Sequence, residues 1–594
     1  MEWSLYNKDG YLKECVFSNN RTQLDIVKEV IAAIKEGFKV IFIKGSCGSG
    51  KSAIALHIAK ELGKTSIVVP IKNLQKQYQT DYMDNLYILK DNKEKLNISV
   101  IDGRNNHKCP YKNESCDNRY LPCTIEIKKD NLNAIKEYVN QNSFINTKEI
   151  TDLKEVRRKT IALSCPYWSP IIPKEMNYNI KDAKEIEYKG LKNKNFIYYK
   201  RKDGCSYYDQ FMNYVNADVI IFNSKKYELE NVMDRKPETK IEIIDECDEF
   251  LDSLCSEKNI NMNKLLRKVN NLINPELREL KFEIINTINE IKENKDVTQI
   301  NKTKVVDLFE LFLENTKLYD ETEENSNYFN YVYEIGKYFE NILDETYIST
   351  HKNMHNDTIL TIVTVNLERK LKEFLDKNKV FIMMSGTIHS EEVIKNVFGI
   401  KNFKIIEAET KFKGKINKVR SGLEKKFNNI LLKQTGAREM YLKALSNCLL
   451  LSVSPVLVHV NSFADLPSNY EKDLYKLNIK TSEELIEEQD KYKKGELIQQ
   501  FKNKEIDILY STRCSRGIDL PGDLCNSIII TKYPYPNMNS LFWKILKKNK
   551  PDQFNLFYFD KARRELIQRV YRGLRSEEDE LNLLSPDLRV LEEF

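Results

Sequence analysis

Residues 39–62 read KVIFIKGSCGSGKSAIALHIAKEL, and this stretch decides the fold. Residues 39–43 form an apolar run typical of a short buried strand, and residues 53–59 have the composition of a helix that can end at Gly63. The glycine-rich loop between them lets backbone N–H groups close around phosphate oxygens at a helix N-terminus. Strand, loop and helix in this order predict an α/β domain with a nucleotide-phosphate site.

The loop itself supplies the candidate phosphate ligands, which are Gly45, Ser46, Cys47, Gly48, Ser49, Gly50, Lys51 and Ser52. We expect Lys51 to neutralise the β- and γ-phosphates of ATP and the Ser52 hydroxyl to bind Mg²⁺. Cys47 stands where many side chains are tolerated, so it is interpreted as a small filler. A helical apolar pattern over residues 22–34 precedes the strand.

A second strand pattern, at residues 240–244, ends in the carboxylates Asp245 and Glu246. Ligands of parallel sheets gather at the carboxyl ends of their strands. Asp245 is therefore expected to hold the magnesium shell, and Glu246 to orient or deprotonate the attacking water. Alone, such a pair is more typical of a solvated loop. Together with the phosphate loop, it predicts hydrolysis of the bound nucleotide.

Length and composition indicate a large multidomain protein. A chain of 594 residues exceeds one hydrophobic core and predicts roughly three or four domains. Its 41% hydrophobic and 31% charged residues, without a bilayer-length apolar run or a secretory signal, predict a cytoplasmic protein with no membrane partner. The net charge of +6, from 94 basic and 88 acidic residues, neither requires nor excludes nucleic acid.

Five cysteines lie between the phosphate loop and the acidic strand end: Cys109, Cys116, Cys123, Cys165 and Cys205. The first three are separated by six residues each time, which is looser than the pairs of most structural zinc sites. Four thiolates complete a [4Fe–4S] site, although a zinc site would use the same ligand type. Unligated structural cysteines are the remaining interpretation.

Five later stretches stand in a fixed order: TSIVVPIKNLQ at 65–75, MSGT at 384–387, VLVHVNSF at 456–463, STRCSRGIDLPG at 511–522 and QRVYRGLR at 568–575. They resemble motifs Ia, III, IV, V and VI of superfamily 2 helicases. The cysteines point to one branch, because CSYYDQ at 205–210 is followed by the apolar stretch ADVIIFN at 217–223. The chain thus resembles the XPD/DinG-like iron–sulfur helicases, including phage and archaeal members.

The resemblance implies an α/β fold with two RecA-like parallel-sheet motor domains and two insertions in the first. The iron–sulfur domain would cover residues 101–206, and a helical arch-like domain residues 256–355. Motor domain 1 would then comprise residues 1–100, 207–255 and 356–411, and motor domain 2 residues 412–594. Apolar residues at helical spacing before and after Pro275 independently predict helices in the arch-like segment.

The resemblance also assigns residues. Arg21 and Gln23 resemble the adenine-contacting element, and Gly517 and Asp519 of motif V join the nucleotide-binding set. Cys205 becomes the preferred fourth cluster ligand, with Cys165 as the alternate.

Motif VI supplies three further candidates. Gln568 is the first residue of this motif. Arg572 and Arg575 lie three positions apart on a predicted helix, so both guanidinium groups would share one face and reach ATP across a domain cleft.

The chain departs from the family at two places. The acidic motif reads Asp-Glu-Cys-Asp where relatives carry Asp-Glu-Ala-His, which leaves the coupling role of Asp248 open. Tyr571 replaces a usual glycine in motif VI. Neither change removes a group that phosphate chemistry needs.

The expected activity is an ATP-dependent DNA helicase that moves 5′ to 3′ on single-stranded DNA and opens forked DNA, with a monomer as the expected state. The 5′-to-3′ direction of movement is inferred from the family resemblance alone. A translocase that remodels nucleic acid without unwinding, and a binding scaffold with a vestigial ATPase, are the alternatives. The sequence leaves the pathway open among repair, replication and a viral programme.

Overall fold

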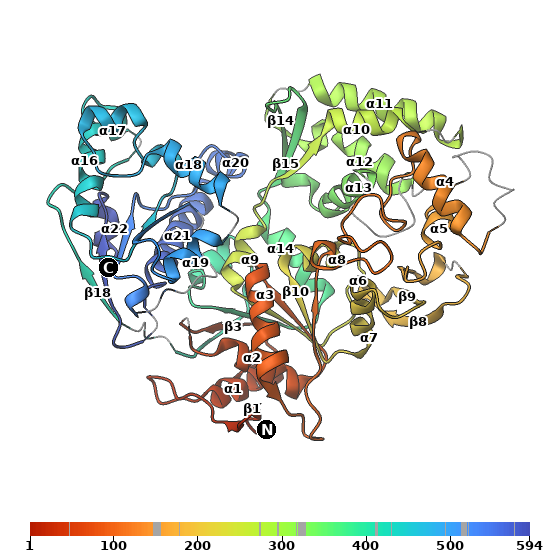
Figure 1. The fold of residues 1–594 in the computed structure, drawn as a ribbon, viewed down its shortest axis with the longest axis horizontal. Helices are drawn as coiled ribbons and strands as arrows, with labels where there is room; N and C mark the ends of the chain where they lie inside the picture. Colours follow the sequence, from red (N-terminus) through yellow and green to blue (C-terminus); the bar gives the residue numbers. More distant parts are fainter. Residues whose placement is uncertain are drawn as a thin grey trace.

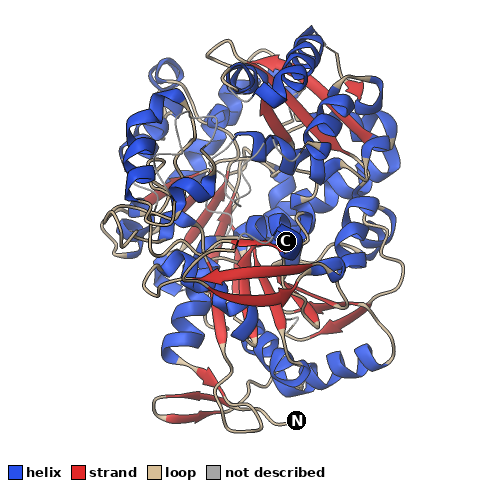
Figure 2. Cartoon of the chain, turned by 90° about the vertical axis from the view of Figure 1, so that its right-hand side faces the viewer, coloured by secondary structure: helices blue, strands red, loops and turns tan. Residues whose placement is uncertain are grey.

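The computed structural model places two parallel-sheet domains side by side, with two insertions beside the first (Figure 1). It describes residues 1–594 except 47, 146–155, 177–178, 273–274, 294–295, 316–317, 319–327, 410, 412–413, 429, 493–494, 513–519, 521 and 575. Figure 2 distinguishes the sheets, in red, from the helices that cover them. Among the described helices, none is long and apolar enough to cross a bilayer.

Motor domain 1 is built on a seven-stranded parallel sheet in the order β17-β3-β16-β11-β4-β10-β6. Its strands are buried apolar runs, as expected for a sheet covered on both faces. The strands are β3 (Val40–Lys44), β4 (Thr65–Val69), β6 (Ile98–Ile101), β10 (Val219–Asn223), β11 (Ile241–Asp245), β16 (Phe381–Ser385) and β17 (Lys404–Glu407).

The helices of motor domain 1 lie before, between and after these strands in the chain. They are α1 (Gln23–Lys35), α2 (Lys51–Leu62), α3 (Lys72–Gln79), α8 (Ser224–Val232), α9 (Cys247–Ser253), α14 (Leu367–Lys377) and α15 (Glu391–Asn396). Gly63 ends α2 with a φ of 90°, a conformation that favours glycine. A small antiparallel sheet of β1 (Leu5–Asn7), β2 (Gly10–Leu12) and β5 (Tyr87–Ile88) lies near the N-terminus.

Motor domain 2 carries a five-stranded parallel sheet in the order β18-β22-β21-β19-β20. The strands are β18 (Lys415–Lys418), β19 (Val456–His459), β20 (Ile508–Ser511), β21 (Ser527–Ile530) and β22 (Glu580–Leu584). The helices are α16 (Ala437–Leu450), α17 (Asn469–Tyr475), α18 (Ser482–Lys491), α19 (Glu496–Lys502), α20 (Leu541–Asn549), α21 (Pro551–Val570) and α22 (Leu588–Glu592).

The cysteine-rich insertion has little regular structure around its cysteines. Its helices are α4 (Leu132–Gln141) and α5 (Arg158–Ala162), and its antiparallel sheet contains β7 (Ile171–Pro173), β8 (Lys184–Lys189) and β9 (Asn195–Lys200). Helices α6 (Ser206–Asp209) and α7 (Asn213–Asn216) connect Cys205 to β10. Cys109, Cys116, Cys165 and Cys205 are buried in the same apolar core as Trp168. The loops that carry the cysteines are therefore held by packing around the thiols.

The second insertion contains the expected helices and, in addition, a sheet. The helices are α10 (Met262–Asn270), α11 (Arg278–Glu293), α12 (Val305–Glu314) and α13 (Tyr328–Phe339). The sequence pattern did not predict the four-stranded antiparallel sheet of β12 (Lys258–Asn261), β13 (Thr298–Gln299), β14 (Thr346–Lys352) and β15 (Thr358–Thr364). Strands β14 and β15 pair over seven residues and form the long hairpin beside α10 (Figure 1).

The two motor domains share an apolar contact through α20 and α21. Trp543 and Phe557 from these helices belong to the same buried core as Phe398, which follows α15 in motor domain 1. The rings of Phe398 and Phe557 lie 5.6 Å apart in an edge-to-face arrangement. This contact brings α21, which carries the start of motif VI, against the acidic strand end of motor domain 1.

Candidate functional site

The phosphate loop connects β3 to α2, as the sequence predicted. Gly48 and Gly50 adopt φ values of 79° and 71°, which a residue with a side chain rarely adopts. Lys51 is buried, and its Nζ donates to the carbonyl oxygens of Gly45 (3.0 Å) and Ser46 (3.3 Å). The loop therefore curls around the ammonium group of Lys51. Cys47 lies outside the described residues.

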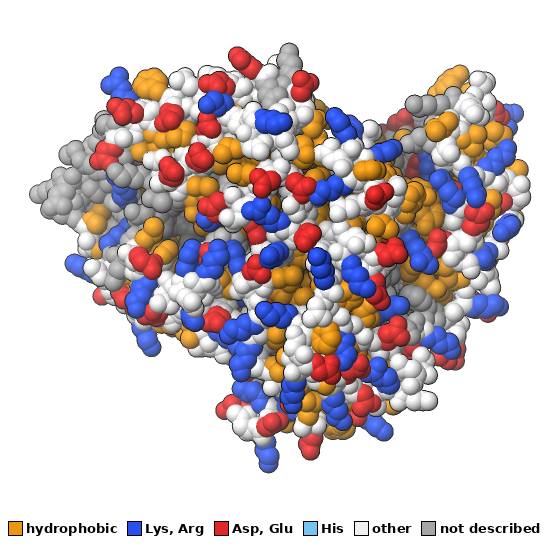
Figure 3. Space-filling view, turned by 180° about the vertical axis from the view of Figure 1, so that it is seen from behind, with side chains coloured by type: hydrophobic (Ala, Val, Ile, Leu, Met, Phe, Trp, Pro, Cys, Tyr) orange, Lys and Arg blue, Asp and Glu red, His pale blue; other side chains and the backbone are white. Residues whose placement is uncertain are grey.

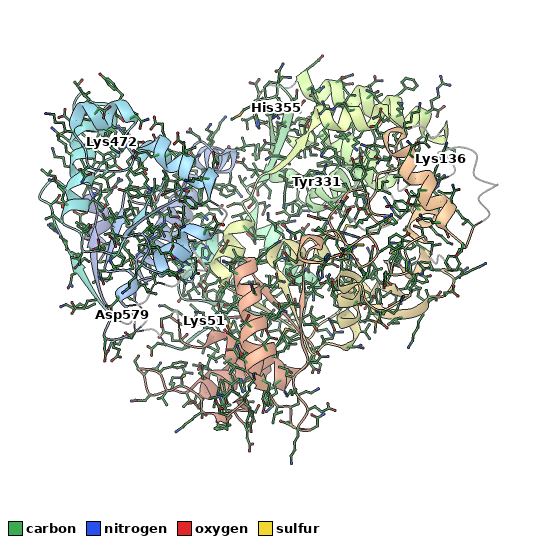
Figure 4. All side chains as sticks on the ribbon, in the orientation of Figure 1. Lys51, Lys136, Tyr331, His355, Lys472 and Asp579 are labelled. Atoms are coloured by element: carbon green, nitrogen blue, oxygen red, sulfur yellow. The ribbon has the colours of Figure 1, made fainter. Side chains whose placement is uncertain are left out.

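Lys51 lies on the side of motor domain 1 that faces motor domain 2, and Asp579 lies on the facing edge of motor domain 2 (Figure 4). The strand that follows the second insertion also supports the loop, because Gly45 N donates to the Ser385 carbonyl oxygen at 3.2 Å. The phosphate loop thus lies between parts of the chain that are far apart in sequence.

Asp245 ends β11 beside the phosphate loop. The hydroxyl of the fully buried Tyr78 donates to Asp245 Oδ2 at 3.0 Å and is also hydrogen-bonded to the side chain of Ser52. The two oxygen ligands expected for Mg²⁺ therefore meet at one tyrosine hydroxyl. Burial raises the pKa of Asp245, while the nearby charge of Lys51 opposes the rise. Sequence reasoning missed Tyr78, because no local pattern marks it.

Glu246 occupies a left-handed backbone conformation, with φ 50° and ψ 55°, directly before α9. Such a conformation costs free energy for a residue with a side chain and is found preferentially at functional sites. The Ser385 hydroxyl lies 3.4 Å from Glu246 Oε2 and 2.8 Å from Asp248 Oδ1. Motif III and the acidic motif are thus in direct contact.

Asp248 also contacts motor domain 2. Gln568 Nε2 donates to Asp248 Oδ2 at 2.6 Å and to the Thr387 hydroxyl at 2.5 Å. The aspartate that replaces the usual histidine therefore accepts hydrogen bonds from both motif III and motif VI. This contact joins the acidic strand end to α21 across the two motor domains.

Around this contact lies a buried group of charges that the sequence did not reveal. Arg564 on α21 forms ion pairs with Asp252 (3.0 Å), Asp560 (2.7 Å) and Asp248 (3.4 Å). Lys561 and His389 also contact Asp252, at 2.8 and 3.0 Å. The charge of Arg564 and the other cations keeps the pKa of the buried Asp252 well below its usual value despite desolvation.

The expectation that Arg572 lies on a helix was wrong. Helix α21 ends at Val570, and Arg572 follows in the turn that leads toward β22. Gly573, two residues beyond the C-cap Tyr571, is a poor helix former and does not favour continuation of α21. Arg572 is nevertheless buried, and its charge helps to lower the pKa of His459 on β19. Arg575 lies outside the described residues.

The candidates from motif V, Gly517 and Asp519, also lie outside the described residues. Arg21 and Gln23, in contrast, are placed beside the phosphate loop. Gln23 Nε2 donates to the carbonyl oxygens of Ser49 (3.2 Å) and Gly50 (3.3 Å). Arg21 donates to the Glu407 carbonyl oxygen at 2.9 Å and pairs with Glu29.

The five cysteines come together in the first insertion. The thiol of Cys116 is hydrogen-bonded to those of Cys109 and Cys205, which lowers the pKa of Cys109 to about 6 and also lowers that of Cys205. Burial and then the charge of Cys123 raise the pKa of Cys165 to about 12. Cys109 and Cys205 are therefore closer to the thiolate form that metals bind than Cys165 is.

Arg104 contacts the thiol of Cys123, the fifth cysteine of this group. Its Nη1 lies 3.3 Å from Cys123 Sγ, and its guanidinium group stacks over the Tyr207 ring at 4.3 Å. Tyr207 and Tyr208 are themselves buried here, so they pack around the cysteine region. Within the described parts of the chain, no group of three or more His, Cys, Asp and Glu residues is arranged to hold a metal ion.

Comparisons with known proteins agree with this architecture. The model of the type III restriction enzyme res subunit matches residues 17–156, and that of a helicase C-terminal domain matches residues 445–593. A solved XPD helicase structure covers 96% of this chain and 97% of its own length at 16% identity, with a TM-score of 0.54. The chain thus shares the fold of XPD helicases, and parts of it match the models of a helicase C-terminal domain and of the res subunit.

Two further similar proteins extend the comparison. A solved structure of apo XPD covers 95% of the chain and 96% of its own length at 14% identity, with a TM-score of 0.51. A curated protein of Methanocaldococcus jannaschii, described as a "probable ATP-dependent helicase", is 28% identical over 397 residues. That match covers 61% of this chain and 53% of the relative, so the chain spans about half of the relative's length. The predicted α/β fold with two parallel-sheet motor domains is confirmed.

Proposed function

We propose that this XPD/DinG-like protein is an ATP-dependent DNA helicase that translocates on single-stranded DNA and separates the strands of a forked duplex. The observation that carries the proposal is the 2.6 Å contact between Asp248 and Gln568. It links the carboxylates beside the phosphate loop to motif VI of the other motor domain. A change at the γ-phosphate can therefore alter the relative position of the two domains, which is what a translocating motor requires.

Each described residue of the nucleotide site has a proposed role in binding ATP and Mg²⁺. Lys51 would neutralise the β- and γ-phosphates, and Ser52 and Asp245 would bind Mg²⁺. Both side chains are hydrogen-bonded to the Tyr78 hydroxyl, so the Ser52 hydroxyl and the Asp245 carboxylate lie close to each other, as two ligands of one Mg²⁺ would have to. Bound Mg²⁺ supplies charge stabilisation at the β- and γ-oxygens.

Glu246 is proposed to hold the attacking water, since it directly follows Asp245 in the chain and its carboxylate lies next to the Ser385 hydroxyl. Arg572 is proposed to reach the phosphates from motor domain 2, together with Arg575. Gly517 and Asp519 complete the proposed nucleotide-binding set. Together these residues would confine hydrolysis to the closed arrangement of the domains.

We further propose that Cys109, Cys116, Cys123 and Cys205 hold a [4Fe–4S] cluster, with zinc as the alternative metal. The contact of Cys116 with Cys109 and Cys205, and the lowered pKa values of the latter two, support these ligands. Cys165, which is buried in the same apolar core, stays the alternate fourth ligand. Such a cluster ties together loops that otherwise contain little regular structure.

DNA binding is expected in a local groove, because basic and acidic residues are interspersed along the sequence. Lys and Arg side chains are mixed with Asp and Glu over the face shown in Figure 3, in keeping with a net charge of +6. Binding of single-stranded DNA combines contacts of basic side chains with the DNA backbone and stacking of bases on aromatic side chains. A surface on which basic and acidic side chains are mixed allows both.

The test uses protein purified without oxygen, followed by iron and sulfide analysis and unwinding assays on 5′- and 3′-tailed duplexes. Unwinding of the 5′-tailed duplex alone is the expected result. Displacement of a bound protein without strand separation would favour a remodelling translocase. Absence of DNA-stimulated ATP hydrolysis would favour a scaffold with a vestigial ATPase.

A further inference from the structure

The hydroxyl of Tyr78 lies between the two side chains that are proposed to bind Mg²⁺. It donates to Asp245 Oδ2 at 3.0 Å. Burial raises the pKa of Tyr78 well above its usual value, so the phenol stays protonated and has one hydrogen to donate. Because that hydrogen goes to Asp245, the hydrogen bond between Tyr78 and Ser52 must be donated by the Ser52 hydroxyl.

The direction of these hydrogen bonds leaves oxygen lone pairs available to a metal ion. Ser52 gives its hydrogen to Tyr78, so its oxygen can accept a cation. Asp245 is held through both oxygens, because Glu246 N donates to Oδ1 at 3.1 Å while Tyr78 donates to Oδ2. Each carboxylate oxygen retains a further lone pair. A hydroxyl and a carboxylate are oxygen ligands of the kind that Mg²⁺ prefers, so these residues fit the ion.

Helix α3 holds Tyr78 in this place. The side chain is only 2% exposed and packs in the apolar core that α3 shares with the phosphate-loop helix α2. One turn earlier, the buried Gln75 donates through Nε2 to the carbonyl oxygens of Ile101 (2.9 Å) and Ile221 (3.4 Å), which lie in β6 and β10. A π-helix, Thr80–Asn85, follows α3 directly, and such segments are frequent at functional sites. The position of the tyrosine oxygen is therefore set by the attachment of α3 to the sheet.

We infer that Tyr78 is a positioning residue for magnesium, whose hydroxyl orients the Ser52 hydroxyl and the Asp245 carboxylate toward the same Mg²⁺ ion. The inference rests on the proposed ATPase function and adds a residue to its site. Ligands that are already oriented bind a cation without the cost of ordering them, so the effect of Tyr78 falls on metal affinity. Binding of nucleotide without metal depends instead on the loop backbone and Lys51.

The experiment measures metal affinity separately from turnover. Full-length wild type and Tyr78→Phe are mixed with a fluorescent ADP (mant-ADP) and titrated with magnesium chloride, and a second titration with mant-ADP in EDTA gives the metal-free Kd. The change removes the hydroxyl and keeps the buried ring. Half-saturation by Mg²⁺ should require about tenfold more metal, because two hydrogen bonds that orient its ligands are lost. The metal-free Kd should stay within about twofold of wild type.

Tyr82→Phe is the matched control. It removes the same atom from a ring that lies 6.0 Å from the ring of Tyr78. Within the described residues, the Tyr82 hydroxyl has no hydrogen bond to Ser52 or Asp245. Half-saturation by Mg²⁺ should therefore stay within about twofold of wild type in this variant.

A double variant tests whether Tyr78 acts through its two partners. Ser52→Ala removes one of the ligands that Tyr78 orients. Adding Tyr78→Phe to Ser52→Ala should therefore raise the half-saturating Mg²⁺ concentration by about threefold, which is less than the tenfold expected in the wild-type background.

Four results would overturn the inference. They are an unchanged Mg²⁺ titration in Tyr78→Phe, an equal loss of metal-bound and metal-free affinity, an equal effect of Tyr82→Phe, and an undiminished effect in the Ser52→Ala background. An equal loss of both affinities is what a purely structural role of Tyr78 would give. Any of these results leaves the proposed function standing if the wild type hydrolyses ATP. A wild type that binds mant-ADP without regard to Mg²⁺ and hydrolyses no ATP would instead reject the proposed function.

Discussion

Replacing Arg564 with methionine should destabilise the contact between the motor domains far more than replacing its neighbour Arg563. The guanidinium group of Arg564 is buried against Asp248, Asp252 and Asp560. Removing one partner of a buried ion pair typically costs about 3–5 kcal/mol. Asp252 would still contact Lys561 and His389, so we expect the lower end, about 3 kcal/mol.

Arg563→Met is the matched control on the same helix. Arg563 pairs with Glu593 at 2.6 Å, but its side chain is 65% exposed, so its loss should cost at most about 1 kcal/mol. Thermal unfolding followed by circular dichroism measures the difference. For a motor domain of this size, about 3 kcal/mol corresponds to a fall in Tm of roughly 6–12 °C.

A double-mutant cycle with Asp252→Asn then isolates the pair itself. The two single changes remove the same contact, so the double variant should be more stable than the sum of the single losses predicts, by about 1–3 kcal/mol. Equal Tm values for Arg564→Met and Arg563→Met, or a coupling energy near zero, would refute the view that this buried pair holds the domains together.

The remaining predictions concern the phosphate loop, the cysteines and the buried His57 of α2, whose Nε2 accepts a hydrogen bond from Ser4 N at 3.1 Å. Lys51→Ala should abolish ATP hydrolysis, measured as phosphate release, while Tm changes little; normal turnover would reject the assigned site. Cys205→Ser should lose bound iron and brown colour in anaerobic protein, whereas Cys165→Ser should keep both, and the reverse pattern would exchange the two roles. Burial lowers the pKa of His57 from 6.5 to about 4, so the unfolded chain binds the proton more readily and stability should fall by up to about 3 kcal/mol as pH drops through this range. His57→Gln should flatten that decline in Tm, and an unchanged slope would contradict the assignment.

Local patterns predicted the elements that carry the nucleotide chemistry. The run at 39–43 became β3 (Val40–Lys44), and the glycine loop lies before α2, because strand, loop and helix are encoded within about twenty neighbouring residues. Asp245 ends β11 and Glu246 directly follows it, for the same reason. The predicted helix through Arg572 was wrong: α21 ends at Val570, shortly before Gly573, which is a poor helix former.

The sequence by itself therefore determined the fold class, the phosphate loop and the set of cysteines, since each depends on residue types at short, regular spacing. Only the tertiary structure decided that Tyr78 meets Asp245, that Arg564 lies among three carboxylates, and that Gln23 bonds to the phosphate loop. It also decided that Cys116 contacts both Cys109 and Cys205. Apart from the steps from Cys109 to Cys116 and from Asp560 to Arg564, these partners lie tens to hundreds of positions apart. Their meeting depends on how sheets, insertions and helices pack, which no local periodicity encodes.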